Sequence, residues 1–125
     1  MPRQSTDFVE VIYLDNAAAV AALKKTAEAL IASNANVIRV YLFGSLAEGT
    51  ATPESDADIM IIVREAEGRF FDRGDDYLKY FDRANLEIGI QFFVYTVEEI
   101  DSMLKSGNDF IKTVVASGLI LSERK

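Results

Sequence analysis

The alternation of apolar and polar positions along the chain predicts strands separated by helices. Short runs rich in β-branched and aromatic residues are typical of strands. Such runs occupy residues 8–14, 37–43, 56–63, 86–95 and 119–121. The run at 37–43 stops at Gly44, as expected for a buried strand followed by a tight turn, and the run at 119–121 is expected to form an edge strand.

Helical periodicity fills most of the intervals between these runs. After a cap at Asp15 or Asn16, apolar residues recur every three or four positions up to Ser33 and predict one amphipathic helix. Thr96 and Glu99 form a capping box that begins a second helix, and a third helix is expected to end at Gly118. The charged, aromatic segment 64–83 predicts a half-buried helix and loop, either a lid or a partner surface.

The order of these elements predicts an α/β (α+β) fold, a mixed β-sheet with helices packed mainly on one side. The chain has 125 residues, two prolines, no internal repeat and no low-complexity tract. A single domain covering residues 1–125 is therefore expected.

Composition narrows the chemistry that this domain can perform. The chain contains no cysteine and no histidine, which excludes thiolate nucleophiles, serine–histidine triads and histidine-ligated zinc. Any catalysis must use carboxylates. The net charge of −7 argues against a nucleic-acid partner. No apolar run approaches the ~20 residues that span a bilayer and the start of the chain is polar, so we expect a cytoplasmic protein without membrane contact.

Two carboxylates open the strand predicted at 56–63. Side chains alternate along a strand, so Asp56 and Asp58 share one face at a separation of roughly 6 to 7 Å. At that distance the two charges repel unless a cation lies between them. Taken alone, such a pair is more often a solvated strand end, but it also suits Mg²⁺, which takes one or two protein carboxylates together with phosphate oxygens.

A binding site for phosphate is predicted at the turn after residues 37–43. Gly44 permits close approach of a ligand to the backbone, and the following residues, SLAEG, can form a short helix whose free N–H groups face an anion. Ser45 adds a hydroxyl donor. If the two strands are neighbours, the turn and the acid pair meet at one end of the sheet and can hold a metal-bound nucleoside triphosphate, although the chain has neither a P-loop nor a GxGxxG motif.

These residues resemble a known family. Phe43, Gly44, Ser45, Gly49, Ser55, Asp56 and Asp58 reproduce the pattern of the minimal nucleotidyltransferases of the DNA polymerase β superfamily, with the same interval between Ser45 and Asp56. The resemblance extends to residues 95–99 and covers most of the chain. It implies transfer of a nucleoside monophosphate, AMP from ATP, to a hydroxyl of a partner protein or a small molecule.

The resemblance also implies roles for individual residues and partners. Asp56 and Asp58 are expected to bind Mg²⁺ and to be catalytic, and Gly44, Ser45 and Ser55 to bind the nucleotide. Family members of this size often pair with small helical HEPN proteins, and in those toxin–antitoxin pairs the nucleotidyltransferase resembles the antitoxin. Such a partner is expected here, and assembly with identical copies is left open.

One position departs from the family pattern. The family places a third catalytic carboxylate on the next strand, where this chain has Gln91. An amide can offer its carbonyl oxygen to a metal but cannot remove a proton. Glu87, four residues earlier at ~3.3 Å each, is too far away to replace it. The alternative hypothesis is therefore a catalytically weak or inactive module that binds Mg-nucleotide or masks a HEPN-type partner, or a nucleotide sensor.

Overall fold

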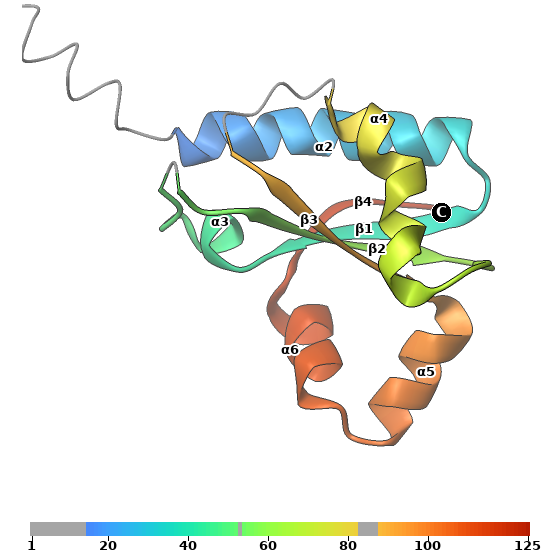
Figure 1. Cartoon of the computed structure of the whole chain (residues 1–125). Helices are drawn as coiled ribbons and strands as arrows, with labels where there is room; N and C mark the ends of the chain where they lie inside the picture. Colours follow the sequence, from blue (N-terminus) through green and yellow to red (C-terminus); the bar gives the residue numbers. More distant parts are fainter. Residues whose placement is uncertain (1–14, 53, 83–87) are drawn as a thin grey trace, which may run out of the picture.

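A four-stranded mixed sheet forms the centre of the protein (Figure 1). The computed structural model describes residues 15–52, 54–82 and 88–125. The strands are β1 (Val37–Phe43), β2 (Ala57–Val63), β3 (Ile90–Thr96) and β4 (Leu119–Glu123), in the order β3-β2-β1-β4. β1 pairs antiparallel with β2 and β4, whereas β2 and β3 are parallel. The predicted mixed sheet is confirmed, and so is the edge position of β4.

The helices begin and end close to the predicted signals. They are α2 (Asn16–Ser33), α3 (Ser45–Glu48), the 3₁₀ helix η1 (Phe70–Tyr77), α4 (Leu78–Asp82), α5 (Val97–Lys105) and α6 (Asp109–Ser117). Asp15 caps α2 by accepting a hydrogen bond from the backbone N–H of Ala18, and the capping box of Thr96 and Glu99 begins α5. The strand predicted at 8–14 lies outside the described residues, as does Glu87.

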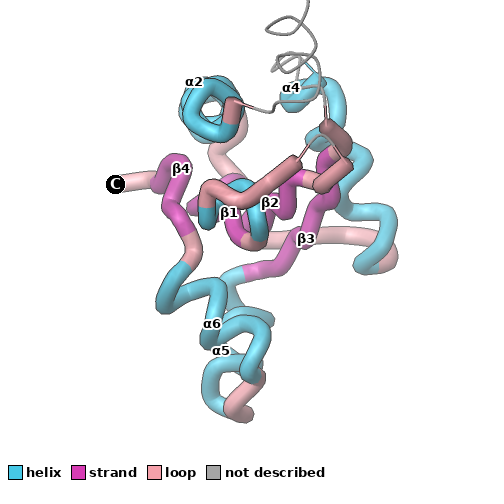
Figure 2. Tube along the Cα trace, turned by 90° about the vertical axis from the view of Figure 1, so that its left-hand side faces the viewer, coloured by secondary structure: helices cyan, strands magenta, loops and turns pink. Residues whose placement is uncertain are grey.

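The helices cover both faces of the sheet, where the sequence predicted helices mainly on one side. α2 and α4 lie on one face and α5 and α6 on the other (Figure 2). The reason is visible in β2, in which Ile59 and Ile61 join the core under α2 while Met60 and Ile62 join a second core under α5 and α6. Because β2 is apolar on both faces, both must be shielded from water.

A salt bridge joins η1 to the beginning of α5. The guanidinium of Arg73, whose side chain is 13% exposed, contacts the carboxylate of Glu99 at 2.7 Å and also donates to the backbone carbonyl of Val94. Arg73 lowers the pKa of Glu99 below its ordinary value through this hydrogen bond. The contact fixes the segment after β2 against β3. Within the described part of the chain, no helix has the length and apolar character to cross a membrane.

Candidate active site

Strand pairing brings the turn after β1 and the acid pair together. Asp58 is the second residue of β2; it pairs with Phe43 on the antiparallel neighbour β1 and with Gln91 on the parallel neighbour β3. Adjacent strands lie about 4.8 Å apart, so Asp58 stands between the end of β1 and the beginning of β3. Gly44 follows Phe43 directly. Gly44, Asp56, Asp58 and Gln91 therefore gather at one end of the sheet.

Two glycines make room for the two carboxylates. The Asp58 carboxylate lies so close to Gly44 that it would overlap a side chain at position 44. On the other side, a Cβ built on Gly89 would stand only 2.7 Å from Oδ1 of Asp56. Gly89 is therefore a point of close approach, and the registers of β2 and β3 match without a bulge.

None of the salt bridges between residues that the structure describes includes Asp56 or Asp58. Burial, and then the nearby charge of Asp56, raise the pKa of Asp58 above its ordinary value. A raised pKa means that the surroundings disfavour the ionised form. Two acids held at the end of a strand in this way are suited to a cation delivered from outside, because a divalent ion would remove both the repulsion and part of the cost of burial.

The backbone at Gly44 has a conformation that favours glycine. Gly44 has φ 80° and ψ −159°, a conformation that residues with a Cβ adopt only with strain. Ser45 is the first residue of α3 and is half-buried. The first N–H groups of a helix have no acceptor within the helix. The turn therefore offers backbone donors and one hydroxyl beside the carboxylates.

Ser55 has a different place from the other predicted residues. Its Oγ accepts a hydrogen bond of 3.0 Å from the backbone N–H of Thr52, and its own N–H donates to the Thr52 carbonyl. These bonds close the turn that leads into Asp56. In this structure Ser55 shapes the approach to the acid pair, and its role in nucleotide binding stays a prediction.

Comparison with known proteins agrees with this geometry. A family model described as "Nucleotidyltransferase domain" matches residues 23–118, which is most of the chain. The matched region includes the turn at Gly44, both acids and Gln91. This chain belongs to the nucleotidyltransferase family.

Two individual proteins are similar to this nucleotidyltransferase. A protein of Methanocaldococcus jannaschii named "Putative protein adenylyltransferase" is 33% identical over 93 residues, which are 71% of this chain and 60% of that protein. The chain thus spans about 60% of the length of this curated relative. A crystal structure described as a "putative nucleotidyltransferase" from Sulfolobus solfataricus has a TM-score of 0.54 and 21% identity, over 87% of this chain and 84% of that one. The second similarity shows a shared fold.

The residues present fit a magnesium ion, with a smaller carboxylate set than the family pattern implies. Nowhere in residues 15–52, 54–82 and 88–125 do three or more acidic, histidine or cysteine side chains come together in a way that could hold a metal. Asp56 and Asp58 supply two carboxylates, and Gln91, exposed on β3 beside Asp58, supplies an amide oxygen. Mg²⁺ often takes only one or two carboxylates and completes its shell with water and substrate phosphates. Nucleotide phosphates would have to complete this site.

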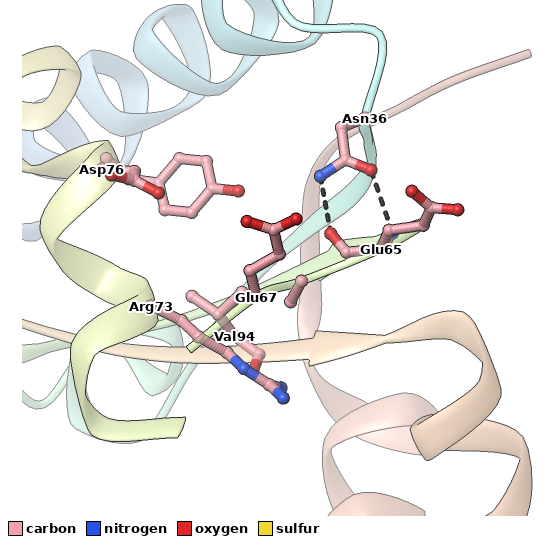
Figure 3. Close-up of a pocket in the computed structure, with 8 residues that line it drawn as sticks. Asn36, Glu65, Glu67, Arg73, Asp76 and Val94 are labelled. Atoms are coloured by element: carbon pink, nitrogen blue, oxygen red, sulfur yellow. Dashed lines mark hydrogen bonds between the residues drawn. The ribbon is translucent and has the colours of Figure 1, made fainter. Parts of the chain in front are cut away.

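A pocket at the opposite end of the sheet is a poor candidate for the same chemistry. It has a volume of about 300 Å³ and lies beyond the end of β2 (Figure 3). Glu65, Glu67 and Asp76 line it, while Arg73 is engaged with Glu99. Five residues of β2, roughly 16 Å, separate Asp58 from Val63 at that end. An acidic pocket repels the phosphates of a nucleotide.

Proposed function

We propose that this protein is a metal-dependent nucleotidyltransferase that transfers AMP from ATP to a hydroxyl of a partner protein or a small molecule. The observation that carries the proposal is the acid pair beside the turn at Gly44, where burial and the charge of Asp56 raise the pKa of Asp58. The name of the M. jannaschii relative supports an adenylyl group and a protein acceptor. A helical HEPN-type partner, with this chain as its antitoxin, is the specific form of that acceptor that we propose.

The chain's own residues hold the reacting groups in place. Asp56 and Asp58 would bind Mg²⁺, which supplies neutralisation of the phosphate charge and alignment of the attacking and leaving oxygens. The turn at Gly44 and Ser45 would hold the β- and γ-phosphates through backbone and hydroxyl donors. The acceptor oxygen forms a bond to the α-phosphorus, the bond to the bridging oxygen breaks, pyrophosphate leaves and the hydroxyl proton passes to water.

Gln91 favours a second candidate function. It lies beside Asp58, where an acid would hold a second metal and activate the acceptor, and a neutral amide does neither. On this account the protein keeps affinity for Mg-nucleotide and acts by binding and masking its partner. The two candidates share the nucleotide site and differ in whether a covalent product forms.

A transfer assay distinguishes the two functions. The protein is incubated with Mg²⁺, ATP labelled at the α-phosphate and the protein encoded by the neighbouring gene. We expect label on the acceptor with the natural sequence, none with Asp58→Ala and more with Gln91→Asp. Asp75→Ala, which changes an exposed acid on η1, serves as the matched control and should transfer normally.

Two other outcomes have clear meanings. The masking function is supported if two results are found together. Only the Gln91→Asp variant labels the acceptor, and the natural protein binds the acceptor in a pull-down experiment. Calorimetry with Mg-ATP tests the nucleotide site that the two candidate functions share. If the natural protein gives no heat of binding, nucleotide binding is contradicted for both functions.

A further inference from the structure

A second cavity adjoins the acid pair and has no role in the mechanism described above. It has a volume of about 600 Å³ and lies between the end of β1, α3 and α6. Gly44 lines it, and the same glycine is in contact with the Asp58 carboxylate. The cavity and the proposed phosphate site therefore share a wall.

The lining of this cavity is suited to an uncharged, partly apolar group. Phe43, Ala47, Phe110 and Val114 supply apolar surface, and Thr113 and Ser117 supply hydroxyl groups. Among the described residues that line the cavity, Glu48 alone is ionisable, and none is a lysine or an arginine. With an acid and no basic side chain, the part of the cavity away from Gly44 is a poor site for phosphate, whereas the cavity's volume falls in the range of sites for small organic ligands, about 300–1,000 Å³.

Phe110 is held in a fixed orientation at this cavity. Its ring packs against Phe43 at 5.5 Å with an interplanar angle of 72°, and against Phe93 at 5.7 Å. Despite these two contacts the residue is 39% exposed. An aromatic ring that is fixed by its neighbours and still partly open to solvent is a ready surface for stacking a flat, apolar group.

We propose that this cavity receives the nucleoside of the triphosphate, with the base stacked on Phe110 and polar edges facing Glu48 and Thr113. The proposal rests on the proposed function, because it needs the phosphates at Gly44. In a nucleotide the sugar is joined directly to the phosphates, so a cavity that shares Gly44 with the phosphate site lies where the nucleoside must go. The acceptor hydroxyl then approaches from the exposed side of β3, past Gln91.

Binding measurements with two ligands test this assignment. Calorimetry compares Mg-ATP with Mg-tripolyphosphate, which has the phosphates and no nucleoside. Base stacking on an aromatic residue changes affinity by about 5-fold to 150-fold. We therefore expect Phe110→Ala to weaken Mg-ATP about 10-fold to 100-fold and to leave Mg-tripolyphosphate unchanged, while Phe110→Tyr keeps the affinity for both.

A blocking variant tests the cavity without removing packing from the protein. Thr113→Trp places a large side chain in the cavity from an exposed position on α6, and is expected to weaken Mg-ATP alone. Ala116→Trp, on the exposed surface of α6 and outside the cavity lining, is the control and should bind both ligands normally. Thermal unfolding of each variant checks that the fold is retained.

Each remaining outcome overturns the inference in a distinguishable way. If Phe110→Ala and Thr113→Trp bind Mg-ATP as tightly as the natural protein, the nucleoside lies elsewhere, although the proposed function survives. If these variants keep Mg-ATP affinity and lose only transfer, the cavity holds the acceptor. If the natural protein binds neither ligand, the proposed function fails together with the inference.

Discussion

Replacing Asp58 by asparagine is expected to stabilise the metal-free protein at neutral pH and to abolish its response to magnesium. The pKa of Asp58 is raised in the folded protein, first by burial and then by the charge of Asp56. The folded state therefore holds this proton more tightly than the unfolded chain. The carboxyl favours folding below its ordinary pKa of 3.8, and that advantage is lost as the pH rises through the raised value.

The contribution of repulsion, the second of the two causes, follows from the separation of the two charges. Asp56 and Asp58 are two residues apart, about 6.6 Å along an extended chain. Their repulsion is about 0.6 kcal/mol in a medium like water and about 2.5 kcal/mol at an effective dielectric constant of 20. Because Asp56 is exposed, the lower half of this range applies, and we expect a gain of about 1 kcal/mol for Asp58→Asn at pH 7. For a chain of this size that raises Tm by about 3–5 °C.

Thermal unfolding followed by circular dichroism measures the effect. In EDTA at pH 7 the variant should melt above the natural protein, and the gap should narrow at pH 3, where Asp58 is protonated in both states. Mg-ATP at 100 times its Kd should then stabilise the natural protein by about 2.7 kcal/mol and the variant hardly at all. Asp75→Asn serves as the control for loss of an exposed charge. A lower Tm for Asp58→Asn in EDTA at pH 7, or equal stabilisation of both proteins by Mg-ATP, would refute the reasoning.

Two further substitutions test the walls and supports of the site. Gly89→Ala places a methyl group 2.7 Å from Oδ1 of Asp56. Because the flexible carboxylate should turn away, Tm should change by less than about 2 °C, while calorimetry should show about tenfold weaker binding of Mg-ATP. An unchanged affinity for Mg-ATP would contradict the assignment of Asp56 to metal binding. Glu99→Gln should cost about 1 kcal/mol in urea unfolding at pH 7, because the salt bridge with Arg73 is charge-assisted yet partly exposed. The pKa of Glu99 is lowered in the folded protein, so its contribution is present above pH 4.5 and lost as the pH falls through the lowered value; a cost that stays constant down to pH 3 would argue against the ion pair.

Local signals in the chain were sufficient for most elements. The strands at 37–43 and 56–63 were recognisable as short runs of branched and aromatic residues, and the helices were recognisable by their caps at Asp15 and Thr96. These features act within a few residues through hydrogen bonds and side-chain shape, so they can be read without knowing the fold. The spacing of Gly44 from the acid pair was also readable, because it depends only on the length of the connection between two strands.

Other features depended on contacts between distant parts of the chain. The apolar residues of β2 indicated burial, but they could not show that α5 and α6 would cover the face opposite α2. The role of Gly89 beside Asp56 was visible only once β3 had paired with β2 in a definite register. The cavity at Phe110 likewise arises because α6 returns to the end of β1.

The sequence by itself determined the chemistry that is open to this protein: carboxylates without histidine or cysteine, a glycine–serine turn, and an amide at position 91. Those are properties of side chains and short spacings. Only the tertiary structure decided that the turn, both acids and Gln91 meet at one end of the sheet with a cavity beside them. The physical reason is that strand register and helix packing are set by burial of apolar surface from the whole chain, and no local segment contains that information.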